Sequence, residues 1–115
     1  MSSTRILSLL GELAALLRQH DHSGHAAYVE AVRTIAEWDF PACTPALQSG
    51  ALWGGSGAVW EVGAFPSAAE TTRFWRLLID LAEAMRAAGV RCERADTISK
   101  MLQERIQLLT PGPNA

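Results

Sequence analysis

LWGGSGAVWEV, residues 52–62, is the segment that interrupts an otherwise helical pattern. Four glycines lie between Gly54 and Gly63, and each glycine inside a helix costs up to about 1 kcal/mol relative to alanine. We therefore expect a glycine turn here, with Trp53 before it and Trp60 after it, and residues 58–62 are compatible with an extended segment. This turn separates two helical halves and so decides how the chain must fold.

On the N-terminal side, apolar residues recur every three or four positions, a spacing that predicts amphipathic helices over residues 4–19 and 25–38. Gly11, inside the first of these, is tolerable if another helix approaches closely there. The short polar connector 20–25 makes the two helices antiparallel neighbours. The expected inward residues are Ile6, Leu9, Leu10, Leu13, Leu16 and Leu17, followed by Tyr28, Val29, Val32, Ile35 and Ala36.

Closer to the turn, Pro41 disfavours helical geometry in the residue before it, so the second helix should end at residues 39–41. Thr44 followed by Pro45 is typical of a helix start, and Gly50 is a plausible stop. A single helical turn over residues 45–49 fits between them.

On the C-terminal side, Ser67 and Glu70 form the sequence signature of a capping box. It predicts a helix over residues 68–88, which Gly89 should cap, and a last helix follows over residues 92–109. The expected inward residues are Phe74, Trp75, Leu78, Leu81, Ala82 and Met85, then Ala95, Ile98, Met101, Leu102, Ile106 and Leu109.

These segments predict an all-α fold, an antiparallel four-helix bundle with a glycine-rich, Trp-flanked loop between its second and third helices. With 115 residues the chain fits one domain, residues 1–110, followed by a flexible tail, residues 111–115. No window reaches the roughly 18 uninterrupted apolar residues of a membrane span. Cys43 and Cys92 lack the spacing of a disulfide framework, so reduced thiols in a cytoplasm are expected. The net charge of -2 and the scattered basic residues argue against nucleic acid as a partner.

Three histidines, His20, His22 and His25, lie beside Asp21 and carry ligand atoms that suit zinc. Helical zinc pairs prefer a spacing of four residues, and no cysteine is near enough to complete a site. We expect no metal site and no cofactor, with a solvated turn between helices as the interpretation.

Catalytic motifs are absent from the sequence. Gly54, Gly55, Ser56 and Gly57 resemble a phosphate loop only superficially, because no lysine follows and no strand is predicted before them. They are interpreted as a structural turn. A nucleophile would need a histidine brought near it by the fold, and no Gly-x-Ser-x-Gly elbow is present. The chain is therefore not expected to be an enzyme.

Tryptophan is frequent, with four in the chain. Trp75 fits the core stripe of its helix, whereas Trp53 and Trp60 flank the turn, and tryptophan is enriched at binding hot spots. Residues 1–65 carry six acidic and three basic residues, a local charge of -3, which could attract a basic partner. The predicted partner-binding residues are Trp53, Trp60 and Glu61, with Glu37 and Asp39 as weaker companions.

LWGGSG (52–57), followed by the capped helix that contains LIDLA (78–82), resembles a family of small uncharacterised bacterial helical proteins with a Leu-aromatic-Gly-Gly-x-Gly turn. Such proteins are similar to immunity proteins, which neutralise a co-produced toxin. The family tends to carry a polar or acidic residue after the turn, where this chain has Trp60 and Glu61. The resemblance therefore applies, residue by residue, only to the glycine turn.

The expected function is thus a cytoplasmic protein-binding module, an immunity protein that covers a cognate toxin domain. Two alternatives stay open. One is a small enzyme or ligand-binding protein with a pocket at the glycine turn, and the other is a homo-oligomeric helical bundle that associates through tryptophan and leucine.

Overall fold

The computed structural model describes residues 2–62 and 65–109 of the chain. These residues form helices and turns but no strand, which confirms the prediction of an all-α fold. The predicted tail, residues 111–115, lies outside the described residues. The elements are α1 (Ser2–Gln19), α2 (Ser23–Trp38), α3 (Phe40–Leu47), α4 (Gly50–Trp53), the 3-10 turn η1 (Val59–Glu61), α5 (Ala68–Ala87) and α6 (Glu93–Leu109).

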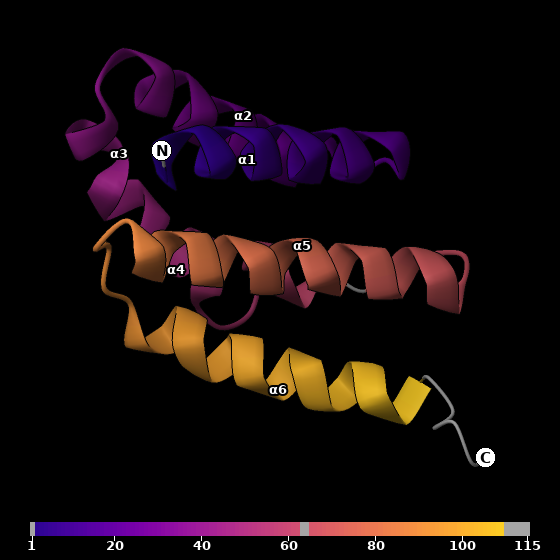
Figure 1. Ribbon diagram of the computed structural model, residues 1–115. Coiled ribbons are helices and arrows are strands. Elements are labelled where there is room, and N and C mark those ends of the chain that lie inside the picture. The colour runs from indigo at the N-terminus through magenta and orange to yellow at the C-terminus, as the bar shows by residue number, and fades with distance from the viewer. Residues whose placement is uncertain (1, 63–64, 110–115) are drawn as a thin grey trace.

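The long helices lie side by side in the order α2, α1, α5, α6, and each runs antiparallel to its packed neighbour (Figure 1). Two contacts show that α1 and α5 are antiparallel. Arg5 at the start of α1 lies 3.7 Å from Asp80, and His20, just after the end of α1, lies 3.1 Å from Glu70. The short helices α3 and α4 connect the two halves, and α4 contacts α6. Long antiparallel helices are thus established, whereas the closed bundle topology stays a prediction.

One hydrophobic core runs through both halves of the molecule, and its largest members come from α1, α4 and α5. The predicted stripes supply most of it. Two predicted core residues are exposed, Ile35 to 42% and Leu109 to 45%, and three others, Tyr28, Trp75 and Met101, are partly buried against the core. Ile35 lies at the edge of the α2 stripe and Leu109 is the last residue of α6, so neighbouring helices do not cover them.

The helix ends follow the sequence signals closely around α5. Ser67 Oγ accepts a hydrogen bond from the Glu70 backbone N–H at 3.2 Å, as the capping box predicts. The carboxylate of Glu70 contacts His20 rather than completing the box. At the other end, Gly89 has a positive φ of 80°. The Val90 N–H bonds the Met85 carbonyl at 2.9 Å, which is the Schellman arrangement that a glycine cap predicts.

The segment before the turn is more helical than predicted. The chain breaks only at Asp39, and α3 then begins with Pro41 in its first turn, where a missing N–H does no harm. Pro45 lies inside α3 rather than at a helix start. Burial of Cys43 and Leu47 on one face explains why helix persists there, since tertiary packing overrides local propensity. Residues 58–62 also differ from the prediction, because η1 is a helical turn and not an extended segment.

Gly11 has the close neighbour that the sequence suggested. A Cβ atom at this position would lie 3.2 Å from Nε of Arg33 on α2, and that Nε donates to the Leu7 carbonyl oxygen at 3.1 Å. A glycine in α1 therefore lets an arginine lie across the helix. None of the helices in the described part of the chain has the length and hydrophobicity needed to cross a bilayer.

Candidate functional site

The glycine turn is shaped by close backbone contacts. A Cβ atom on Gly54 would lie 2.4 Å from the carbonyl oxygen of Gly50, so only glycine fits without a backbone shift. Gly57 has a φ of 88°, in the left-handed region that favours glycine. Gly55, Ser56 and Gly57 are the exposed part of the turn. The structural interpretation of these glycines is therefore supported at Gly54 and Gly57 by specific geometry.

Trp53, which precedes the turn, lies in the core. Its side chain is fully buried, and its indole Nε1 donates to the Leu47 carbonyl oxygen at 2.8 Å. This bond satisfies the polar atom of the ring inside the core. Trp53 has no surface with which to contact another protein, and we leave it out of the partner-binding surface.

Trp60, which follows the turn, is half-buried and holds the turn against the helices. Its Nε1 donates to the Gly54 carbonyl oxygen at 2.5 Å. The guanidinium of Arg105 on α6 lies 6.0 Å from the ring centroid of Trp60 and 5.8 Å from that of Trp75. This cation–π contact connects η1 to α5 and α6. Trp60 thus has a structural role, while the adjacent Glu61 is exposed.

Two hollows border this turn. One measures about 180 Å³ and is lined by Trp60, Glu61, Val62, Trp75 and Arg105, and the other measures about 330 Å³ and is lined by Trp60 together with Glu93, Arg94, Thr97 and Ile98 of α6. Small-molecule sites enclose about 300–1,000 Å³. The first hollow is below that range and the second is at its lower end, so the ligand-pocket alternative rests on the hollow between Trp60 and α6.

The histidine connector packs on the glycine turn and on α5. His20 Nε2 lies 3.1 Å from the Glu70 carboxylate, and His25 Nε2 donates to the Gly57 carbonyl oxygen at 3.0 Å. The rings of His20 and His22 both contact Phe65. Within residues 2–62 and 65–109, no three His, Cys, Asp or Glu side chains are grouped so as to hold a metal ion. The connector therefore contacts the glycine turn at Gly57, the segment before α5 at Phe65, and α5 at Glu70. The sequence had suggested a turn exposed to solvent.

The thiol of Cys43 lies inside the core and is not a candidate nucleophile. Cys43 is fully buried, and its burial raises the pKa of the thiol. A protonated thiol without solvent access is a poor nucleophile. Both cysteines are free.

The other predicted partner-binding residues, Glu37 and Asp39, flank an exposed tryptophan that the sequence interpretation passed over. Trp38 is the last residue of α2, and 86% of it is exposed. It lies two positions beyond the buried Ala36, about 200° around the helix, and so points away from the core. That displacement from the stripe is a sequence signal that could have identified it.

We call Ile35, Glu37, Trp38 and Asp39 the Trp38 corner. Ile35 is one helical turn before Trp38, so an exposed aliphatic side chain neighbours the indole. Glu37 forms an ion pair with Arg33 at a spacing of four residues. Asp39 is exposed and has no ion pair within the described residues. The corner therefore combines apolar surface with a free carboxylate.

The structure separates the predicted site residues into two groups. Trp53, Trp60 and Glu61 belong to the glycine turn, where only Glu61 is exposed. Glu37 and Asp39 belong to the Trp38 corner. Comparison of the chain with protein-family models, curated proteins and solved structures gave no match.

Proposed function

We propose that the protein is a protein-binding module and that its partner contacts the Trp38 corner. The observation that carries this proposal is the 86% exposure of Trp38 between two carboxylates. A tryptophan buries a large area at small entropic cost on binding, and tryptophans are enriched at hot spots. Ile35, one helical turn earlier and 42% exposed, adds apolar surface to the indole, and contiguous exposed apolar surface is a feature of protein-interaction sites.

Charge indicates the kind of partner. Residues 1–65 carry a net charge of -3, and Asp39 is unpaired among the described side chains. A basic surface on the partner would be complementary to this corner and would associate faster at low salt. We infer that the partner is a basic toxin domain and that the module is an immunity protein in a bacterial cytoplasm. The predicted four-helix bundle of α1, α2, α5 and α6 is its scaffold in this proposal.

The test uses the protein encoded next to this one, co-expressed and purified with it. Trp38→Ala should weaken the measured affinity by about 30-fold or more, the loss of a hot-spot contact worth about 2 kcal/mol. Leu108→Ala is the matched control because Leu108 is 87% exposed but lies at the C-terminal end of α6. It should leave the affinity unchanged.

The charge contribution is tested with Glu37→Gln combined with Asp39→Asn. This variant should associate more slowly and with less salt dependence, because electrostatic steering acts mainly on the association rate. Equal binding by wild type and Trp38→Ala would contradict the proposal. So would a neighbouring protein without toxic activity that does not bind. A dimer that Trp38→Ala dissociates would instead support the homo-oligomer alternative.

A further inference from the structure

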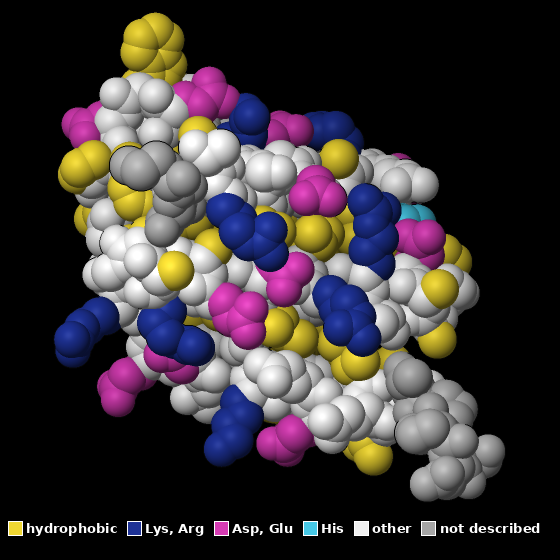
Figure 2. Space-filling view, viewed as in Figure 1, with side chains coloured by type: hydrophobic (Ala, Val, Ile, Leu, Met, Phe, Trp, Pro, Cys, Tyr) yellow, Lys and Arg dark blue, Asp and Glu magenta, His cyan; other side chains and the backbone are white. Residues whose placement is uncertain are grey.

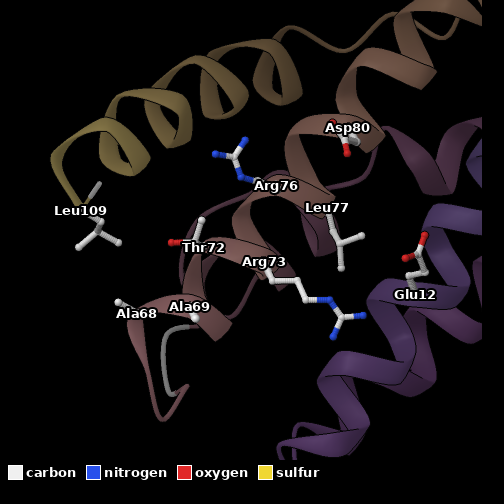
Figure 3. A pocket seen from close by; sticks show the side chains of 9 residues that line it. All are labelled: Glu12, Ala68, Ala69, Thr72, Arg73, Arg76, Leu77, Asp80 and Leu109. Atoms are coloured by element: carbon white, nitrogen blue, oxygen red, sulfur yellow. The ribbon is translucent and has the colours of Figure 1, made fainter. Parts of the chain in front are cut away.

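A groove of about 620 Å³ crosses the first turns of α5 (Figure 3). The start of α5 lies at the opposite end of the molecule from the end of α2, which carries the Trp38 corner (Figure 1). One wall of the groove is α1, which contributes Glu12, and the other is the end of α6, which contributes Leu109. On this face, basic and acidic side chains alternate around exposed hydrophobic surface (Figure 2). Its volume lies within the range of about 300–1,000 Å³ that holds a small molecule.

Two arginines on α5 dominate the charge of the groove. Arg73 extends toward α1 and Arg76 toward α6, so their guanidinium groups lie on different sides of the groove (Figure 3). Neither forms an ion pair with any residue in 2–62 or 65–109. Arginine usually finds a carboxylate or phosphate for its planar set of donors. Two exposed guanidinium groups beside one hollow are therefore available to an external anion.

The acidic residues of the groove do not cancel this charge. Asp80 is paired with Arg5 across the α1–α5 interface, at 3.7 Å. Glu12 is exposed and has no ion pair within the described residues. The unpaired groups are thus two cations and one anion, an excess of one positive charge. Charge complementarity favours a negatively charged ligand.

The remaining surface of the groove is apolar. Leu77 is nearly buried in its floor, and Leu109 is 45% exposed at its edge. Ala68 and Ala69 add methyl groups at the start of α5. A ligand that used only its charge would leave these side chains in water, so the lining suits a molecule with an apolar part as well.

We propose that this groove binds an amphipathic anion, a small molecule with a carboxylate or phosphate head and an apolar chain. The guanidinium of Arg73 or Arg76 binds the head, since the donors of arginine match both groups, and the other arginine adds to the positive charge of the groove. The chain lies along Leu77 and Leu109. This site is separate from the Trp38 corner, and binding there requires no protein partner.

The experiment is calorimetric titration of the full chain with decanoate and with decyl phosphate, each below its critical micelle concentration. Both should bind saturably, and their relative affinity identifies the preferred head group. Decanol, which has the same chain without the charge, should bind about tenfold more weakly or worse, since charged hydrogen bonds are worth about 1.5–3 kcal/mol. Decanol that bound as well as both anions would overturn the proposal.

Arg73→Gln combined with Arg76→Gln should weaken anion binding by about tenfold or more. Both side chains are exposed, so the melting temperature should stay unchanged and folding can be checked independently. The matched control is Arg94→Gln, which removes an exposed arginine of α6 that does not line the groove. Retention of full affinity in the double variant would overturn the site.

Glu12→Gln tests the sign of the ligand charge. Removing the unpaired carboxylate should tighten the binding of decanoate, because that carboxylate repels an anion in the same groove. Weaker binding in this variant would show that the groove recognises a positively charged group or a zwitterion, and it would contradict the proposal.

Discussion

The glycine turn and the Trp38 corner both place a tryptophan beside the end of a helix, yet the two tryptophans have opposite environments. At the turn, Gly54 lets the chain fold back tightly, and Trp53 is enclosed with its indole N–H bonded to Leu47. At the corner, the helix breaks for only one residue, Asp39, before α3 begins. Trp38 lies on the far side of α2, where the described residues leave 86% of it exposed.

This difference shows that a glycine next to a tryptophan can indicate a ring buried in the core and not a ring exposed to a partner. Glycine allows the backbone to approach the ring and to present a carbonyl acceptor to the indole, as Gly54 does for Trp60. Trp38 lies beside charged residues and off the apolar stripe of α2. It has no adjacent glycine that would bring the backbone close to its ring. The local backbone therefore distinguishes an anchoring aromatic residue from a surface one.

The largest expected effect is at Trp53. Trp53→Ala should lower the free energy of unfolding by about 3–5 kcal/mol, because it removes a fully buried ring and leaves a cavity. The measurement is urea denaturation. Trp53→Phe is the control, since it keeps an aromatic ring and removes the bond to Leu47, and it should lose less. If the alanine variant were as stable as wild type, the turn would not anchor the core through this ring.

The next effect is at the backbone of the turn. Gly54→Ala should destabilise the protein by about 1–3 kcal/mol, because its Cβ atom would meet the Gly50 carbonyl oxygen at 2.4 Å. Gly55→Ala provides the comparison, since a Cβ atom there meets nothing within 4 Å. That variant should stay within about 0.5 kcal/mol of wild type by the same denaturation assay. Equal losses in both variants would mean that general flexibility, and not close approach, explains the glycines.

The long helices could be predicted well because apolar spacing and end caps depend on residues close together in the sequence. The Ser67 cap and the Gly89 cap each depend on a few neighbouring residues, and the structure confirms both ends of α5. The extent of α3 was not predicted, because Pro41 indicates a helix end and Thr44–Pro45 indicates a new start, which left only one helical turn over residues 45–49. That extent depends on burying Cys43 and Leu47 against distant segments, which no local pattern reveals.

The two candidate sites also differ in whether local sequence or tertiary packing determines them. Trp38 could be predicted as exposed from its angle to Ala36, since helical geometry converts that spacing directly into direction. The groove could not be predicted. Arg73 and Glu12 are far apart in sequence and come together only through the antiparallel packing of α1 on α5. Whether Arg73 has an ion pair is likewise a property of the tertiary structure.

The smallest expected effect on stability is at Trp38, and it sharpens the comparison most. Trp38→Ala should change the free energy of unfolding by no more than about 0.5 kcal/mol, the usual range for an exposed side chain without packing partners. Acrylamide quenching of tryptophan fluorescence measures the same property independently. Trp53 is buried, and Trp60 and Trp75 are half-buried, so the most readily quenched emission should come from Trp38 and should disappear in the variant.

The stability and quenching measurements together decide what kind of surface the corner is. A loss of about 2 kcal/mol in Trp38→Ala would place this ring in the same class as Trp53, packed and structural, and would remove the reason to expect a partner there. Unchanged stability with lost quenching would leave an aromatic ring of 86% exposure that the fold does not use. Such a ring tends to associate with apolar surface on another molecule, so its role must be sought in what covers it.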